Sequence, residues 1–204
     1  MTVRLNVNPR HPEPRKIALA TKELEDGGVA LYPTDTVYAL GCALESRRAI
    51  ERIYRLKQME AHQPLALICA DVREASKYGV ISDFAYRQLR RLLPGPYTFI
   101  LPATRDVPRV LLDKRRTVGI RVPDSPICAA MVAALGRPLL TSSAVPPGAD
   151  DAVIDVDEAK DAWGEELDVL VDGGAVPGVA STVVSLLDDR IEILRAGLGA
   201  DALE

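Results

Sequence analysis

The sequence predicts a single α/β domain over residues 1–204, in which helices pack on a twisted, mixed sheet of about seven or more strands. Short apolar runs typical of buried strands alternate with helical patterns early in the chain and then cluster near its end. No linker, internal repeat or low-complexity segment divides the 204 residues. A chain of this length with 48% hydrophobic residues can bury a core without disulfides or metals.

Helices are predicted from apolar residues at helical spacing and from residues that begin or end a helix. At Asp71 and Ser82, a side-chain oxygen can accept hydrogen bonds from the free backbone N–H groups of a first turn. Gly136 ends another helix, because glycine readily takes the left-handed conformation found there. The predicted helices cover residues 15–25, 48–57, a short stretch after residue 71, 82–93, a short stretch after residue 108, 125–135 and 157–163.

Strands are predicted from short apolar runs bounded by proline, glycine or polar residues. The last two strands follow one another without a helix between them, which favours a mixed sheet over a purely parallel one. The predicted strands cover residues 29–32, 65–69, 97–102, 117–122, 139–144, 168–172, 182–187 and 191–194.

The net charge of −4 hides a strong asymmetry along the chain. Residues 87–121 contain nine basic and two acidic residues, a balance of +7, whereas residues 150–172 contain ten acidic residues and one lysine, a balance of −9. The charges alone fit either two solvated faces or a basic surface for phosphates with an acidic counterweight. Aromatic residues make up only 4% of the chain, which argues against a single-stranded nucleic-acid binder of the aromatic type.

The cysteines indicate the compartment. Cys42, Cys69 and Cys128 are widely spaced, odd in number and form no C-x-x-C motif. This usage predicts buried thiols in a reducing environment, so we expect a cytoplasmic protein. The N-terminal residues lack the apolar stretch of a signal peptide, and no apolar run approaches ~18 residues, so we expect no membrane span.

Hydroxyl side chains recur where predicted strands begin or end. In open α/β sheets, ligands bind beyond the carboxyl ends of strands, so polar side chains there are candidate ligand contacts. Each segment alone also fits a turn held by ordinary side-chain hydrogen bonds. Several such segments on one sheet indicate a single polar site. The candidate hydroxyls are Thr34, Thr117, Thr141, Ser143 and Ser181.

Three basic residues accompany these hydroxyls. Lys57 stands at the end of a predicted helix, where it can stabilise the helix dipole or offer a point charge to phosphate. Arg121 projects from a strand expected to be buried, so its charge needs a partner. That partner is either a structural carboxylate or a carboxylate or phosphate of a ligand. Arg195 follows the last predicted strand.

Several catalytic signatures are absent from the sequence. It contains no P-loop, no G-x-G-x-x-G after a strand, no G-x-S-x-G and no H-E-x-x-H. We therefore expect neither covalent catalysis by a triad nor hydrolysis at a protein-bound metal, and no metal ligands from protein side chains.

Four ordered segments carry a family resemblance. They read PTDTVYALG at residues 33–41, LPGPYT at 93–98, VGIRVP at 118–123 and STVV at 181–184. These strings are similar to the hallmark motifs of the YrdC/YciO family, and the resemblance extends from about residue 9 to residue 197. It implies a YrdC-like α/β fold with a concave, positively charged cleft.

The resemblance also implies a function. Synthases of this family make threonylcarbamoyl-adenylate from L-threonine, bicarbonate and ATP, and their product serves threonylcarbamoylation of tRNA adenosine. No tightly bound cofactor is implied, although Mg²⁺ is expected with ATP. Binding of double-stranded RNA is also attributed to the fold, so an RNA- or tRNA-binding protein without synthase activity is the alternative. The basic segment over residues 87–121 agrees with that alternative.

The family's binding residues map onto the candidate residues of this chain. The resemblance implies contacts to threonine from Thr34, Arg121, Thr141 and Ser181. It implies contacts to the nucleotide and its phosphates from Lys57, Thr117, Ser143 and Arg195. Lys57 and Arg121 are the expected catalytic cations, acting by positioning and electrostatics.

Three departures separate this chain from the synthases it resembles. Met59 stands where the synthases carry the arginine of Lys-x-Arg, and Val145 stands where they carry the asparagine of Ser-x-Asn. Ser125 replaces a favoured histidine. Loss of a cation that touches triphosphate costs about 2–4 kcal/mol of transition-state stabilisation. We therefore expect a YciO-like member that binds ATP or AMP with weak or redirected synthase activity.

Overall fold

The computed structural model describes residues 2–60, 63, 65–112 and 114–203. All strands of this part of the chain join one mixed, ten-stranded sheet. The strands are β1 (Val3–Asn6), β2 (Ala30–Pro33), β3 (Tyr38–Ala43), β4 (Ala66–Ile68), β5 (Tyr97–Pro102), β6 (Thr117–Arg121), β7 (Leu139–Ser143), β8 (Val169–Asp172), β9 (Thr182–Ser185) and β10 (Glu192–Arg195).

The helices begin and end largely where the sequence predicts. The Asp71 carboxylate accepts a hydrogen bond from the backbone N–H of Glu74 at 2.7 Å, and Gly136 takes a φ of +63°. The α-helices are α1 (Pro14–Glu25), α2 (Arg47–Leu56), α3 (Val72–Tyr78), α4 (Asp83–Leu92), α5 (Pro126–Leu135) and α6 (Val156–Trp163). Short 3₁₀ turns are η1 (Arg109–Leu111), η2 (Gly164–Glu166), η3 (Leu187–Asp189) and η4 (Ala200–Leu203).

The sheet combines parallel and antiparallel pairs in the order β1-β8-β2-β3-β7-β4-β6-β5-β9-β10. Strand β4 runs parallel to β6 and antiparallel to β7, whereas β5 runs antiparallel to β6 and parallel to β9. This mixture confirms the predicted twisted, mixed sheet. It also brings β4, β6 and β7 side by side, although they are far apart in the sequence.

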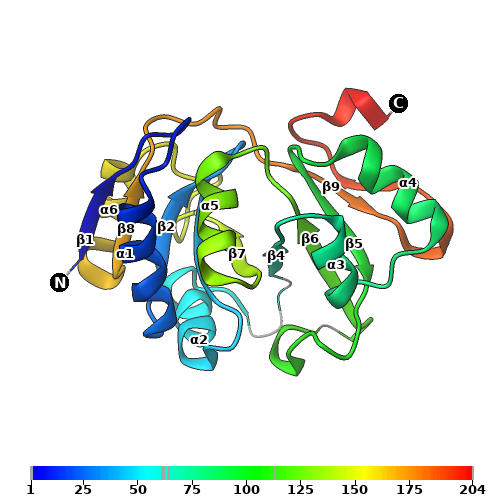
Figure 1. Ribbon diagram of the computed structural model, residues 1–204, viewed down its shortest axis with the longest axis horizontal. Coiled ribbons are helices and arrows are strands. Elements are labelled where there is room, and N and C mark those ends of the chain that lie inside the picture. Colours follow the sequence, from blue (N-terminus) through cyan, green and yellow to red (C-terminus); the bar gives the residue numbers. More distant parts are fainter. Residues whose placement is uncertain (1, 61–62, 64, 113, 204) are drawn as a thin grey trace.

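Helices cover both halves of the sheet (Figure 1). Helices α1 and α5 lie in front of the half that contains β2 and β7, and α6 lies behind it. Helices α3 and α4 lie in front of β5 and β6. The core forms two buried clusters, one of which includes Tyr32 and Met131 and the other Phe99 and Leu89. No described helix is long and apolar enough to cross a membrane.

Two strands were not predicted from the sequence. The sequence predicted no strand between residues 32 and 65, but Tyr38–Ala43 forms β3 and pairs antiparallel with β2 and β7. Every residue of β3 is buried, so both of its faces are covered and it lacks the alternation of a half-exposed strand. Strand β1 has only four mostly exposed residues and is held by pairing with β8 at the sheet edge.

Candidate anion-binding site

Six of the eight predicted site residues line one cavity of about 320 Å³ on the central strands. We call it the cationic cavity. Its lining comes from β4, β5, β6, β7, β9 and β10, and from the residues that follow α2. The six predicted residues that line it are Lys57, Arg121, Thr141, Ser143, Ser181 and Arg195.

The floor of the cationic cavity consists of small residues in register. Ala66 of β4 pairs with Gly119 of β6 on one side and with Thr141 of β7 on the other. Side chains two apart on a strand share a face, so Arg121 projects from the same face as Gly119. A Cβ added at Gly119 would lie 3.1 Å from the Cβ of Ala66. A side chain at this position would therefore crowd Ala66, and glycine keeps the floor beside Arg121 free of one.

Lys57 enters the cavity from the C-terminal end of α2. Its Nζ donates a hydrogen bond of 2.6 Å to Ser142 Oγ on β7. Burial and, to a lesser extent, the charge of Arg195 lower the pKa of Lys57 to about 8. An ammonium group with so low a pKa is poorly solvated, so a bound anion would stabilise its charged form.

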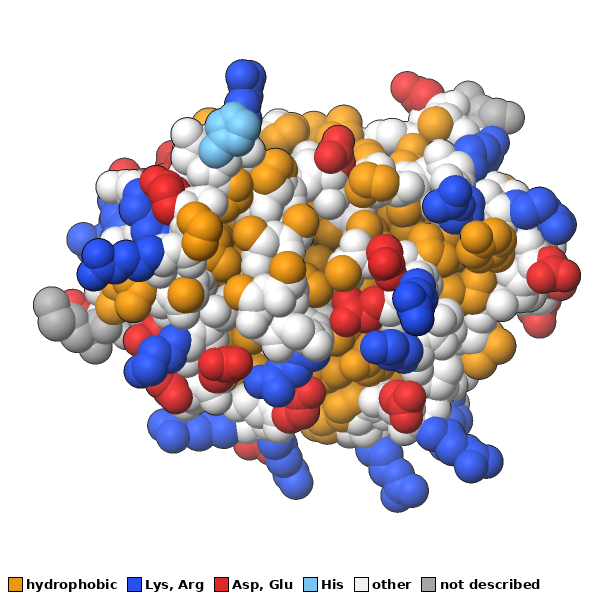
Figure 2. Space-filling view, viewed as in Figure 1, with side chains coloured by type: hydrophobic (Ala, Val, Ile, Leu, Met, Phe, Trp, Pro, Cys, Tyr) orange, Lys and Arg blue, Asp and Glu red, His pale blue; other side chains and the backbone are white. Residues whose placement is uncertain are grey.

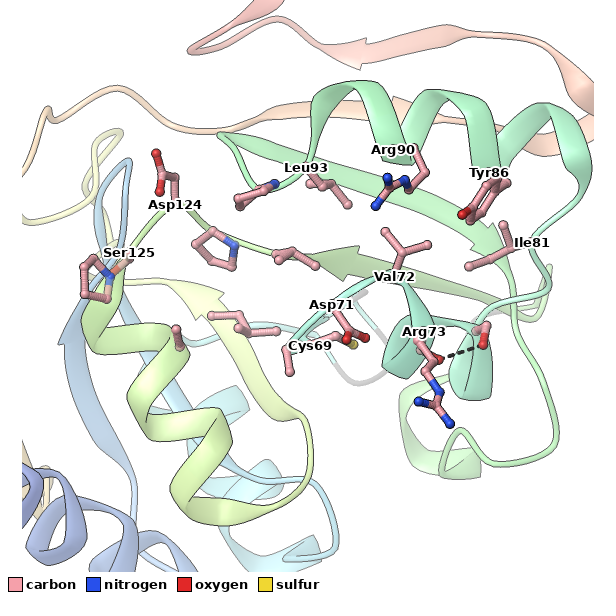
Figure 3. A pocket seen from close by; sticks show the side chains of 18 of the residues that line it. Cys69, Asp71, Val72, Arg73, Ile81, Tyr86, Arg90, Leu93, Asp124 and Ser125 are labelled. Carbon is pink, nitrogen blue, oxygen red and sulfur yellow. Dashed lines mark hydrogen bonds between the residues drawn. The ribbon is translucent and has the colours of Figure 1, made fainter.

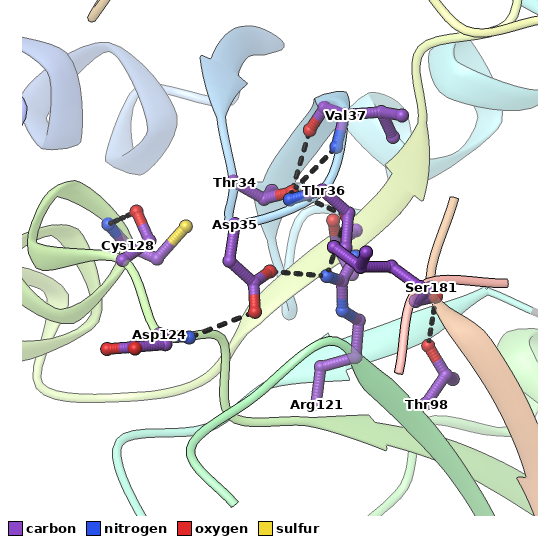
Figure 4. A network of polar contacts seen from close by, with 12 residues as sticks. Thr34, Asp35, Thr36, Val37, Thr98, Arg121, Asp124, Cys128 and Ser181 are labelled. Carbon is purple, nitrogen blue, oxygen red and sulfur yellow. Dashed lines mark hydrogen bonds and ion pairs between the residues drawn. The ribbon is translucent and has the colours of Figure 1, made fainter. Parts of the chain in front are cut away.

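Arg121 is held by a carboxylate beside the cavity. Its Nη2 lies 2.9 Å from Asp35 Oδ1 and donates a hydrogen bond of 3.1 Å to Thr36 Oγ1 (Figure 4). The arginine is only 4% exposed. Both partners lie in the turn between β2 and β3. Asp35 is therefore a structural carboxylate of the kind expected as one possible partner of Arg121. Arg121 also lines the cavity.

A β-bulge aims Arg195 into the cavity. Ile193 of β10 pairs with Val184 of β9, yet Arg195, two residues on, pairs with Val183. In a regular antiparallel ladder Arg195 would instead oppose Thr182, and its side chain would lie on the other face of the sheet. Because of the extra residue in the bulge, Arg195 instead lies on the same face of the sheet as Val183, which also lines the cavity.

Arg195 is anchored on the backbone at the start of β9. Its Nε and Nη2 donate hydrogen bonds of 3.2 and 2.9 Å to the carbonyl oxygen of Ser181. Burial, followed by the charge of Arg121, lowers the pKa of Arg195. The effect of the Arg121 charge on Arg195 indicates that the two guanidinium groups lie within electrostatic reach of each other.

Hydroxyl groups complete the wall. The buried Tyr32 hydroxyl donates a hydrogen bond of 2.6 Å to Thr141 Oγ1. Thr98 Oγ1 and Ser181 Oγ lie 3.0 Å apart and share a hydrogen bond. Because Thr141 accepts from Tyr32, its own hydroxyl hydrogen is available to a ligand acceptor.

The electrostatics of the cationic cavity favour an anion. Lys57, Arg121 and Arg195 line it, and no carboxylate stands among the described lining residues. Asp35, just outside the lining, offsets one of the three positive charges through Arg121. In the described ranges no group of three His, Cys, Asp or Glu residues could hold a metal ion. The described lining of the cavity therefore offers no carboxylate to Mg²⁺.

Two predicted site residues lie outside the lining. Thr34 is 6% exposed. Within the β2–β3 turn, its Oγ1 shares a hydrogen bond of 2.9 Å with Thr36 Oγ1 and donates one of 2.7 Å to the Val37 carbonyl. Thr117 begins β6 opposite Pro102, beyond the cavity floor. Their predicted ligand contacts stay predictions.

The three positions at which the family resemblance predicts departures from the synthases lie in two places. Met59 and Val145 both line the cationic cavity and bring apolar groups to it. Ser125 instead caps α5 by accepting a hydrogen bond of 3.3 Å from the Cys128 N–H. It lines a different groove, described next.

A larger groove of about 740 Å³ lies between α4 and α5 (Figures 2 and 3). Hydrophobic side chains gather in the middle of this face of the molecule (Figure 2). Tyr86 and Arg90 of α4 lie on one side, and Ser125 lies on the other (Figure 3). Its lining carries charges of both signs, and none of the eight predicted site residues belongs to it. Volume therefore favours this groove as a binding site, but the convergence of cations favours the smaller cavity.

Sequence reasoning missed four residues that support the site: Asp35, Thr36, Thr98 and Ser142. Asp35 and Thr36 lie in the PTDT segment that was singled out, and an unpaired buried Arg121 called for a carboxylate. Which carboxylate would reach Arg121 depended on contact between β6 and the β2–β3 turn.

Comparisons with known proteins agree with the fold described above. The model of the Sua5/YciO/YrdC family, described as telomere recombination, matches residues 22–197. The uncharacterized protein YciO of Escherichia coli K12 is 40% identical over 194 residues, which cover 95% of this chain and 94% of that protein. The crystal structure of E. coli YciO matches with a TM-score of 0.93 over 98% of this chain and 97% of that one.

Two further relatives are named for a ligand or an activity. The threonylcarbamoyl-AMP synthase of Vibrio vulnificus YJ016 is 33% identical over 155 residues, which cover 74% of this chain and 83% of that protein. The structure of P. abyssi Sua5 complexed with L-threonine is 29% identical with a TM-score of 0.86, over 97% of this chain but 57% of that one. On this sequence and structural evidence, the chain belongs to the Sua5/YciO/YrdC family and is related to the threonylcarbamoyl-AMP synthases.

Proposed function

We propose that the chain binds an adenine nucleotide and L-threonine, or the threonylcarbamoyl-adenylate formed from them, in the cationic cavity. The observation that carries the proposal is the convergence of Lys57, Arg121 and Arg195 on a cavity without a carboxylate in its described lining. Net positive charge in a partly buried site favours carboxylate and phosphate ligands. The L-threonine complex of the related Sua5 supports the amino-acid part of the proposal.

In this proposal two sets of residues hold different parts of the ligand, which we call its threonine end and its nucleotide end. Arg121, Thr141 and Ser181 contact threonine, while Lys57, Ser143 and Arg195 contact the nucleotide and its phosphates. Thr34 and Thr117 act from outside the described lining. The chemistry consists of positioning the reactants and offsetting charge on the α-phosphate, for which Lys57 and Arg121 are the catalytic cations.

We further propose that the nucleotide end is weakened or redirected. Met59 and Val145 line the cavity. The family resemblance implies arginine and asparagine at these two positions in the synthases. Neither side chain can donate a hydrogen bond to a phosphate or a base. A missing cation costs about 2–4 kcal/mol of transition-state stabilisation, so turnover falls far below that of a synthase while threonine binding is retained.

The test is calorimetric titration with L-threonine, ATP and AMP, combined with pyrophosphate release in the presence of threonine, bicarbonate and ATP. We expect binding of L-threonine but not of D-threonine, measurable nucleotide binding, and slow pyrophosphate release. Arg121→Lys serves as the variant that removes the planar fork but keeps the charge. Absence of both threonine and nucleotide binding would refute the proposal. Pyrophosphate release as fast as that of a synthase measured in the same assay would refute the proposal that the nucleotide end is weakened.

A second candidate function is double-stranded RNA or tRNA binding, which one observation favours. Of the nine basic residues between 87 and 121, only Arg121 is buried, and the other eight are exposed on α4, on η1 or on the segments around them. Filter binding to a tRNA over a range of salt concentrations tests it. Contact with several phosphates gives a steep fall in affinity with salt, whereas no binding at low salt eliminates this candidate.

A further inference from the structure

The Asp35 carboxylate joins two segments through opposite oxygens. Its Oδ1 accepts a hydrogen bond from Arg121 Nη2 at 2.9 Å, and its Oδ2 accepts one from the backbone N–H of Asp124 at 3.1 Å (Figure 4). The Asp35 side chain is only 8% exposed. Both of its oxygens are therefore committed, and its position in the β2–β3 turn is fixed relative to β6.

The contact with Asp35 occupies only the Nη2 side of the Arg121 guanidinium. Nη2 donates to Asp35 and to Thr36, whereas the buried Nε has no hydrogen-bond partner among the described residues. Figure 4 shows Asp35 on one side of Arg121, with Thr98 and Ser181 on the other. These two residues also line the cationic cavity.

We propose that Asp35 is a positioning residue, which holds Arg121 by its Nη2 so that the remaining donors stay turned to an oxyanion in the cationic cavity. The planar fork of arginine binds carboxylate or phosphate best when two of its N–H groups are aimed together. Asp35 fixes this aim and leaves the ligand to complete the donors of Arg121. The identity of the oxyanion rests on the proposed function; the positioning itself does not.

A purely structural role for Asp35 makes different predictions. If Asp35 only ties the residues after β6 to the β2–β3 turn, its loss lowers the melting temperature without a separate effect on ligand affinity. A positioning role changes the orientation of Arg121 and the affinity for an anion even in a folded variant. Spectroscopy of the Arg121 side chain separates these possibilities.

The experiment follows the Nε–H resonance of Arg121 by ¹H–¹⁵N NMR, with Arg121→Lys to assign it. In the wild-type chain we expect the resonance to shift on addition of L-threonine or of inorganic pyrophosphate. In Asp35→Asn we expect it to move or broaden without ligand, and the dissociation constants to rise about ten-fold or more. Asn offers one acceptor where Asp offers two, so it cannot serve both contacts. The matched control is Asp172→Asn, whose carboxylate pairs with Arg4.

Each outcome decides one part of the proposal. Unchanged affinity in folded Asp35→Asn, or equal losses in Asp172→Asn, overturns the positioning role. If Asp35→Asn does not fold, the titration of the wild-type chain is the test. An Arg121 resonance that shifts with neither L-threonine nor pyrophosphate then overturns the positioning role. A response to pyrophosphate without binding of L-threonine or ATP supports the positioning role while the proposed function fails.

Discussion

Lys57 Nζ lies 2.6 Å from Ser142 Oγ, and this hydrogen bond ties the C-terminal end of α2 to β7 inside the cationic cavity. The hydroxyl accepts from the ammonium group but cannot neutralise its charge. Burial, followed by the charge of Arg195, lowers the pKa of Lys57 to about 8. The protonation state of this lysine consequently changes within the pH range of ordinary binding assays.

Affinity for an anion is expected to fall as pH rises through about 8, because the free protein loses the Lys57 proton there. A bound anion raises this pKa again, so binding near pH 8 takes up a proton. Calorimetry with pyrophosphate in two buffers of different ionisation enthalpy measures that uptake. In Lys57→Met the uptake should vanish, and an equal uptake in the variant would contradict the assignment.

The same lowered pKa affects stability in the opposite direction. The unfolded chain keeps the Lys57 proton up to its ordinary pKa of 10.5, whereas the folded chain releases it near 8. Between these values the unfolded state binds more protons, so this lysine makes stability rise with pH. Urea unfolding of wild type and Lys57→Met at pH 7, 8.5 and 10 should show that contribution only in the wild type.

The double change Met59→Arg with Val145→Asn is expected to tighten ATP binding and raise pyrophosphate release about ten-fold or more. Each charge-assisted contact is worth roughly 1.5–3 kcal/mol, and both positions line the cavity. The two effects should be non-additive if both side chains meet the same nucleotide. The single variants complete the cycle. Unchanged ATP affinity in the double variant would mean that the cavity is built for another ligand.

Tyr32→Phe is expected to lower the free energy of unfolding by about 1 kcal/mol or more. The Tyr32 hydroxyl is fully buried, and its loss leaves Thr141 Oγ1 without its donor. Denaturant unfolding measures the change, and threonine titration checks whether Thr141 still binds. Tyr54→Phe is the matched control, because its hydroxyl makes a 2.7 Å hydrogen bond to Gln63 at the surface. Equal losses in both variants would argue against the buried contact.

The thiols of the folded protein are expected to resist modification at pH 8. Cys42, Cys69 and Cys128 are free and buried, as predicted, and burial raises the pKa of Cys42 and of Cys128 to about 12. Ellman's reagent should therefore report three thiols in denaturant and almost none before unfolding. Rapid labelling of native protein would show that these sites open readily.

Local signals in the sequence were enough for most elements. Apolar spacing and end residues such as Asp71, Ser82 and Gly136 depend only on neighbours within a turn, so they predicted helices that the structure confirms. Strand β3 was missed because both of its faces are covered by tertiary contacts, which removes the alternation that marks a strand.

The features of the candidate site also divide into those that the sequence determined and those that depended on the tertiary structure. The sequence by itself determined the residue types, since hydroxyls at strand ends and cations in apolar surroundings indicate an anion site wherever the sheet brings them together. Only the tertiary structure decided that Ala66, Gly119 and Thr141 stand in register as the floor. It also decided that a bulge in β10 turns Arg195 to the cavity. Strand order and register arise from contacts between distant segments, and no local pattern encodes them.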